Sequence, residues 1–256
     1  MIENRLEYQR MYEVEQKLWW YKVLHNKVLT TIKNHFGKDY TQLKILDAAC
    51  GTGGLLSFLH NNGCKNLTGF DYSQHAVDFS LERNLDVTWG DLKRVEEFRP
   101  EESYDVICCC DALYFLNDHE ITHTLSVLKK RLRPNGIIII NIHAFEAFSG
   151  THDLAVGSTR RFVLNDFQFY TKQANLQIVK NTYWPFFLSL PIWAVRQFQK
   201  LQIKKGWIKA QEVDSDVKYP GDLINQILQL TMSVEETLIP QGPFGSSLFM
   251  VMTSHR

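Results

Sequence analysis

The feature of this chain that most constrains its fold is the alternation of short β-rich runs with helical patterns between residues 43 and 142. The β-rich runs predict strands at 43–49, 66–71, 86–91, 104–111 and 136–142. Helical patterns separate them at 53–63, 73–84 and 118–133. Two more strands are predicted at 176–183 and 246–254. Alternation of this kind implies an α/β fold, here a seven-stranded, mostly parallel sheet with helices on both faces.

The length of 256 residues suits one such domain with added segments. We expect residues 1–36 to form a helical segment before the core and residues 37–184 to form the core itself. Residues 185–240 are expected to be a helical insertion with several prolines, and 241–256 to supply the strand that completes the sheet.

Charge and composition exclude some functions. The 28 basic and 28 acidic side chains cancel, so no overall field recruits nucleic acid. Residues 1–16 are charged and lack the apolar core of a signal peptide, and the five cysteines show no CxxC spacing, so we expect a cytoplasmic protein with reduced thiols. The apolar stretch 184–195 contains two prolines and is too short to cross a bilayer.

Residues 119–123, His-Glu-Ile-Thr-His, match the pattern with which zinc metalloproteases bind their metal. The helix predicted there has one core-facing stripe of apolar residues, Ile121, Leu125, Leu128 and Leu132. His119 and His123 lie roughly 160° from members of that stripe and therefore point to solvent. We expect no metal site.

A stronger signal is the glycine-rich turn "ILDAACGTGG" at 45–54, between the first strand and the first helix. It lacks the lysine of a P-loop. A dinucleotide-binding loop is also glycine-rich, but Asp47 on the strand side of this turn would repel a pyrophosphate. A carboxylate there suits an ammonium group, and S-adenosylmethionine carries both an amine and a cationic sulfonium.

The turn is followed in order by "GFDYS", "WGDL", "YDVICCCDALYFL" and "LRPNGIIII". Over residues 43–143 this series resembles the class I S-adenosylmethionine-dependent methyltransferases, of the type 11-like kind. The resemblance implies a Rossmann-like sheet and S-adenosylmethionine as the cofactor. It also implies the residues around that cofactor, which are Asp47, Ala49, Gly51, Gly53, Asp71, Tyr72, Asp91, Leu92, Asp111 and Leu113.

Within that set, the resemblance gives each residue a role. Asp71, 20 residues after Gly51, would accept the ribose hydroxyls, and Tyr72 would lie along the adenine. Ala49 stands where the family usually has its first glycine, which predicts a slightly tighter pocket. Many relatives have Glu-His at positions 114 and 115; Tyr114 and Phe115 here leave an aromatic wall, and Tyr114 is expected to contact the substrate.

The segment "GTHDLAVGSTRRF" at 150–162 resembles an HDxxxGHxRRY-like segment of a methyltransferase subgroup often associated with polysaccharide or secondary-metabolite pathways, with Ser158 in place of its second histidine. We expect His152 to be the base for a substrate hydroxyl, with His143 as its rival and Asp111 at the sulfonium end. Arg160 or Arg161 would bind an acidic group. The alternative is that His152 and its neighbour only cap a turn.

The N-terminal segment "EQKLWW" resembles Ex(3)WW segments of the same subgroup and predicts a lid in which Trp19, Trp20 and Tyr21 contact substrate or cofactor. The alternative is a helix packed on the sheet edge. The basic, amphipathic residues 190–209 are open to three interpretations: contact with a membrane surface, a cover for the active site, or a dimer contact.

The sequence therefore predicts an S-adenosylmethionine-dependent methyltransferase acting on oxygen of a small or sugar-like metabolite. Nitrogen or carbon as the acceptor atom, and a non-catalytic S-adenosylmethionine-binding protein, remain alternatives. The expected partner is a small-molecule acceptor, and a homodimer is one alternative for the oligomeric state.

Overall fold

The order of elements follows the predicted alternation. The computed structural model describes residues 5–207 and 217–255. Its strands are β1 (Lys44–Ala48), β2 (Asn66–Asp71), β3 (Val87–Trp89), β4 (Tyr104–Cys110), β5 (Leu132–His143), β6 (Leu176–Trp184) and β7 (Ser247–Ser254). Its α-helices are α1 (Arg5–Val14), α2 (Trp19–Phe36), α3 (Gly54–Asn61), α4 (Gln74–Glu82), α5 (Asp118–Lys130), α6 (Thr151–Val156), α7 (Leu164–Ala174), α8 (Ser189–Lys204) and α9 (Asp222–Leu238).

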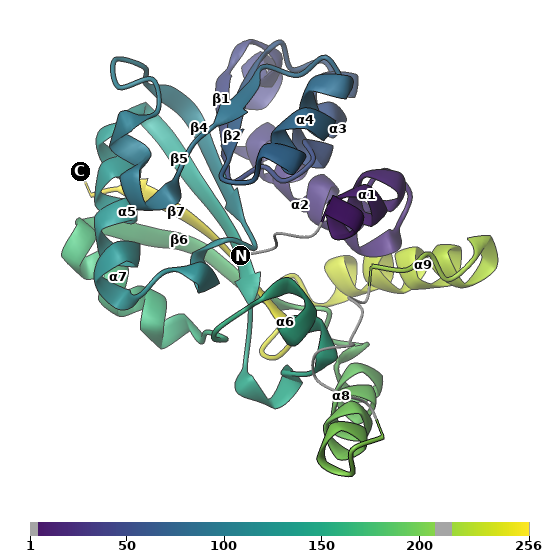
Figure 1. Cartoon of the computed structure of the whole chain (residues 1–256). Coiled ribbons are helices and arrows are strands. Elements are labelled where there is room, and N and C mark those ends of the chain that lie inside the picture. Colours follow the sequence, from purple (N-terminus) through teal and green to yellow (C-terminus); the bar gives the residue numbers. More distant parts are fainter. Residues whose placement is uncertain (1–4, 208–216, 256) are drawn as a thin grey trace.

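The strands form a single sheet in the order β3-β2-β1-β4-β5-β7-β6. All neighbouring pairs are parallel except the two that β7 makes with β5 and β6. The predicted seven-stranded, mostly parallel Rossmann-like sheet is therefore confirmed (Figure 1). The order reverses between β1 and β4, and in sheets of this kind ligands bind beyond the carboxyl ends of the strands at that point.

The alternation of side chains along the central strands separates two apolar layers. On β5, Ile138 and Ile140 pack into the layer under α5 and α7, whereas Ile137 and Ile139 pack into the layer under α2 and α3. This two-residue period is that of a strand buried on both faces. Asn141 is the polar exception in the run, and it lies on the α2 side.

Helix α5 shows where the two histidines of the zinc-like pattern at 119–123 point. Ile121, Leu125 and Leu128 are fully buried, while His119 and His123 are exposed, as predicted. The helix begins with a capping box between Asn117 and Glu120. It ends earlier than predicted, at Lys130, because the chain turns there and Leu132 already belongs to β5. Within residues 5–207 and 217–255 no group of three His, Cys, Asp or Glu side chains is placed to hold a metal.

The segments before and after the core are placed differently. Helix α2 packs on one face of the sheet, α1 lies beside α4, and α8 and α9 project outward (Figure 1). Three parts of the chain lie outside the described residues. They are residues 1–4 of the predicted segment 1–36, residues 208–216 of the predicted insertion 185–240, and residue 256. No helix of the described chain is long and apolar enough to cross a membrane.

Candidate active site

A cavity of about 460 Å³ lies beyond the carboxyl ends of the central strands. The loops after these strands form one wall, the helices α1 and α2 form a second, and residues of α8 and α9 close the remaining side. The predicted site residues that line it are Trp19, Trp20, Tyr21, Asp47, Ala49, Gly51, Asp71, Tyr72, Asp91, Leu92, Asp111, Tyr114, His143, His152 and Arg161.

Three predicted site residues do not line the cavity. Gly53 caps the start of α3 with a left-handed backbone, and Leu113 is buried in the core. Arg160 pairs with Asp118 at 2.5 Å and donates a hydrogen bond to the Tyr170 hydroxyl, on the α5 and α7 side of the sheet. Of the two arginines, only Arg161 faces the cavity.

The glycine-rich turn brings the backbone close to Asp71. Ala49 and Gly51 have positive φ values of 64° and 55°, and the Gly51 amide donates to Asp71 Oδ2 at 2.8 Å. The Ser73 amide donates to the other carboxylate oxygen at 2.9 Å. A left-handed backbone costs a residue with a Cβ roughly 1 kcal/mol, so the alanine at position 49 is tolerated at a cost that glycine would avoid.

Buried carboxyl groups give the cavity an acidic character. Asp47 and Glu15 are buried, Asp111 is partly buried, and all three line the cavity. Burial, together with the charges of Asp71 and Glu15, raises the pKa of Asp47 to about 8. Carboxyl groups held together in this way favour a cationic ligand, because a cation would allow them to ionise. The cavity therefore fits the ammonium and sulfonium groups expected from the sequence.

Aromatic and acidic side chains form the opposite end of the cavity, after β2 and β3. Tyr72 lies 5.6 Å from Trp89 between ring centroids, and the Asp91 carboxylate accepts from the Lys93 amide at 2.9 Å. The second oxygen of Asp91 is left for a ligand or for Arg94, whose Nε lies 3.9 Å from it. An aromatic face beside a carboxylate fits a nucleobase with an exocyclic amine.

Asp111 follows β4 with a positive φ of 52°, an uncommon backbone conformation for a residue other than glycine. The Asn141 side chain donates to Asp111 Oδ2 at 2.9 Å, and Trp184 Nε1 donates to Asn141 Oδ1 at 2.9 Å. The tryptophan therefore determines which end of the Asn141 amide faces Asp111. Among the described residues, Asp111 Oδ1 has no hydrogen-bond partner although it is buried. Burial raises the pKa of Asp111 to about 7.

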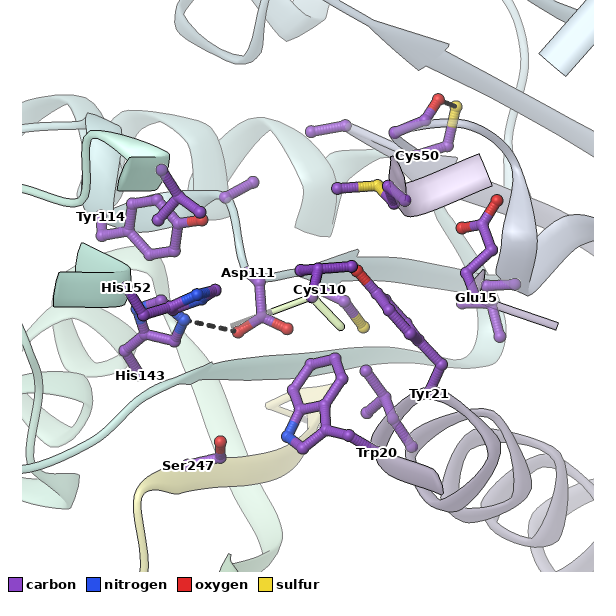
Figure 2. A pocket seen from close by; sticks show the side chains of 18 of the residues that line it. Glu15, Trp20, Tyr21, Cys50, Cys110, Asp111, Tyr114, His143, His152 and Ser247 are labelled. Atoms are coloured by element: carbon purple, nitrogen blue, oxygen red, sulfur yellow. Dashed lines mark hydrogen bonds and ion pairs between the residues drawn. The ribbon is translucent and has the colours of Figure 1, made fainter. Parts of the chain in front are cut away.

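His143, the last residue of β5, lies between two carboxyl groups. Its Nε2 is 3.9 Å from Asp111 Oδ1 (Figure 2). Its Nδ1 is 3.7 Å from Asp153 Oδ1. The ring stacks on Tyr114 with centroids 4.8 Å apart. Burial, together with the positive charge of nearby side chains, holds the pKa of His143 well below its usual value, so the ring is neutral at neutral pH.

His152 lies next to His143, with ring centroids 5.5 Å apart, and both rings face the same end of the cavity (Figure 2). Its neighbour Asp153 is held by Arg161 through two hydrogen bonds of 2.8 and 3.0 Å. Asp153 also accepts from the Gly150 amide. Asp153 therefore caps the turn at Gly150, as the alternative interpretation predicts. Arg161 uses two of its N–H groups to hold Asp153.

The N-terminal helices are fastened to the glycine-rich turn by Glu15. This buried carboxyl group accepts hydrogen bonds from the Thr52 hydroxyl and the Gly54 amide and lies 2.7 Å from the Arg83 guanidinium. Trp20 stacks on Trp184 at 5.6 Å between ring centroids. Residues from α1 and α2 therefore form a wall of the cavity, and the buried residues of α2 pack on the sheet; the predicted lid stays a prediction.

Sequence reasoning missed two residues of this site. Asn141 was included only in an apolar strand, although it is the single polar residue of the run 137–142. Glu15 is the first residue of the Ex(3)WW segment, and nothing near it in the sequence indicates that it pairs with Arg83.

The central part of the chain has known relatives. Residues 45–136 match the family described as a methyltransferase domain. A ubiquinone biosynthesis O-methyltransferase from Rickettsia akari (strain Hartford) is 25% identical over 118 residues, which are 44% of this chain and 45% of that protein. This chain therefore spans less than half the length of the curated relative it matches.

Solved structures resemble almost the whole chain. An S-adenosylmethionine-dependent methyltransferase from Clostridium acetobutylicum has a TM-score of 0.55 at 13% identity, covering 92% of each chain. A SAM-dependent methyltransferase from Archaeoglobus fulgidus has a TM-score of 0.57 at 13% identity, covering 90% of this chain and 93% of its own. At such identities the likeness establishes the fold.

Proposed function

We propose that this chain, whose residues 45–136 match a methyltransferase domain, is an S-adenosylmethionine-dependent O-methyltransferase of a small, largely apolar acceptor. That match supports the predicted methyltransferase class, and the acidic lining of the cavity supports the predicted cationic cofactor. The observation that carries the finer proposal is the buried pair Asp111–His143 at the carboxyl ends of β4 and β5, whose facing atoms lie 3.9 Å apart. The name of the Rickettsia relative also supports oxygen as the acceptor atom.

The residues around the cavity fit the two halves of the cofactor. Asp47 and Asp111 would face the cationic amino-acid half, and Asp71, Tyr72 and Asp91 would hold the nucleoside half. When bound, S-adenosylmethionine supplies a methyl group attached to a positively charged sulfur, which an oxygen nucleophile displaces in line. The protein's own contribution is to hold the acceptor, exclude water and receive the proton.

The pair Asp111–His143 is suited to receive that proton. A hydroxyl acceptor must lose its proton as the new carbon–oxygen bond forms. Asp111, with a pKa of about 7, is partly ionised at neutral pH, which is the range in which a general base is most effective. The lowered pKa of His143 keeps its ring neutral, with one unprotonated nitrogen that can hold the acceptor hydroxyl. We therefore assign proton transfer to this pair and a neighbouring, orienting role to His152.

The lining of the cavity is mostly apolar. Trp19, Trp20, Leu116, Val156 and Ile192 belong to it, and Tyr114 stacks against His143. Such walls favour a phenolic or other weakly polar hydroxyl compound over a sugar, which would leave its hydroxyls without partners. Arg161 donates to Asp153 and to the carbonyls of Ala144 and Ser246, which leaves one N–H, on Nη2, for an acidic substituent.

The test compares His143→Gln with His152→Ala, using His119→Ala on the exposed face of α5 as the control. Cofactor affinity is measured by calorimetry, and methyl transfer is measured with a panel of phenols and hydroquinones. We expect His143→Gln to bind the cofactor normally and to lose about a hundredfold in kcat. A greater loss in His152→Ala would move the base to His152. Binding of the cofactor without transfer to any hydroxyl, amine or carbon acceptor would favour a non-catalytic binding protein.

The sequence also predicted a possible contact of residues 190–209 with a membrane surface. Most of these residues belong to α8, and residues 208 and 209 lie outside the described residues.

A further inference from the structure

Helices α8 and α9 expose more apolar side chains than any other part of the described chain. On α8 these are Leu190, Trp193, Val195, Phe198 and Leu201, with Trp207 just beyond it. On α9 they are Leu223, Ile224, Ile227, Leu230, Val234 and Leu238. Most of the α9 set recurs at intervals of three or four residues, which places it on one face of the helix. Exposed apolar area of this extent marks an interaction surface.

The opposite face of α9 is fixed to the protein. Asn225 accepts from the Trp19 amide at 2.7 Å and donates to the Lys17 carbonyl at 2.9 Å. Glu235 accepts from the amides of Phe186 and Phe187 at 2.8 and 2.7 Å. These bonds hold the helix in one rotation about its axis, so its apolar stripe faces outward.

The charges beside these helices indicate the partner. Residues 185–207 contain no acidic residue and carry four cations, of which Lys204 and Lys205 are exposed. An amphipathic helix with tryptophans and a basic flank is the form that binds at the surface of an anionic bilayer. Cations near such a surface are attracted by its anionic lipids.

The α9 helix of a second copy of this chain would not provide an anionic surface for the cations of α8. Glu235 is buried and accepts hydrogen bonds from Phe186 and Phe187, and Glu236 pairs with Lys27 at 2.7 Å. Asp222 accepts from the Tyr219 hydroxyl at 2.5 Å. The acidic groups of α9 are thus engaged within the chain, and they present no anionic face to the cations of α8.

The same two helices reach the cavity. Ile192 and Arg196 of α8 line it, as do Leu228 of α9 and Pro220 just before that helix. We propose that α8 and α9 form a binding surface for an anionic lipid bilayer. The cavity borders this surface, so an apolar acceptor enters it from the bilayer. Entry of the acceptor from the bilayer rests on the proposed methyltransferase activity, whereas bilayer binding by α8 and α9 does not.

The surface is tested by flotation of the full chain with vesicles of phosphatidylcholine alone or with about a third of phosphatidylglycerol. We expect binding to the anionic vesicles that weakens as NaCl is raised. The double variant Phe198→Glu, Leu201→Glu should lose at least tenfold in vesicle affinity, and so should Ile227→Glu, Leu230→Glu. The control, Leu81→Glu with Phe169→Glu, makes the same charge change at side chains of similar exposure on α4 and α7 and should bind normally.

No binding to anionic vesicles, or equal loss in the control, overturns the proposal. So does a dimer in solution that the α8 or α9 variants dissociate while vesicle binding is absent. The source of the acceptor is tested with a decyl-substituted hydroquinone dissolved in the vesicles and a short-chain, water-soluble one. The α8 variant should raise KM for the first alone. An equal change for both refutes entry from the bilayer, and turnover of neither by the unaltered chain is a failure of the proposed function, which leaves the flotation result standing.

Discussion

Asp47 makes the affinity for S-adenosylmethionine depend on pH. A buried carboxyl group with a pKa of about 8 is about 1% ionised at pH 6 and about a quarter ionised at pH 7.5. If the cationic amino group binds only the carboxylate, Asp47 alone contributes a rise in affinity of about twentyfold over this range, or about 2 kcal/mol, as the pH is raised. The range stops at pH 7.5 because an α-amino group itself loses its proton just above that pH.

The assay is calorimetric titration at pH 6.0, 6.75 and 7.5 in two buffers with different heats of ionisation. The difference between the buffers counts the protons released on binding, which should approach one at pH 6 from Asp47 alone. The variant Asp47→Asn should bind more weakly at pH 7.5. It should keep only the roughly tenfold dependence that Asp111, with a pKa of about 7, can contribute. Asp78→Asn, which removes an exposed carboxylate from α4, is the matched control.

The same raised pKa has a further consequence for the ligand-free chain. Its folded state holds the Asp47 proton more tightly than the unfolded chain, whose ordinary value is 3.8. The unfolded state therefore ionises first, and this group lowers the stability of the fold as the pH rises from 3.8 towards 8. A cofactor affinity that stays flat between pH 6 and 7.5, with heats independent of the buffer, would refute the reasoning.

Three further predictions follow from the hydrogen bonds and dihedral angles of the site. Asn141→Leu removes the donor to Asp111, and we expect kcat to fall at least tenfold while calorimetry shows cofactor affinity within threefold; an unchanged kcat would contradict the assignment. Glu15→Ala leaves the Arg83 guanidinium without its buried carboxylate and should lower the free energy of unfolding by about 3 kcal/mol, measured in urea. Ala49→Gly relieves a positive φ and should raise that free energy by about 1 kcal/mol, whereas a loss of stability would show that its methyl group packs usefully.

The fold and the cofactor half of the site could be predicted because their signals are local. A strand end, a glycine-rich turn and an acidic residue after the next strand stand in fixed order along the sequence, and parallel strands bring their carboxyl ends to one edge. Asp47, Asp71 and Asp91 all reach the cavity for this reason.

The acceptor half could not be predicted with the same accuracy because its contacts join distant parts of the chain. Glu15 meets Arg83, and Trp184 meets Asn141, across separations that no periodic pattern encodes. Adjacent residues on an extended segment point in opposite directions, so "RR" at 160–161 could not say which arginine faces the cavity. The pairing of Arg160 with Asp118 on the far side depends on how α5 packs.

Trp184 connects two parts of the protein that have been described separately. One face of its indole stacks on Trp20 of α2, and its N–H orients Asn141, which in turn holds Asp111. A shift of Trp20 would remove this stacking partner of Trp184 without touching Asp111 itself. Under the proposed function, the chain of contacts from Trp20 to Asp111 would therefore couple the position of the N-terminal wall of the cavity to the aim of the proton acceptor.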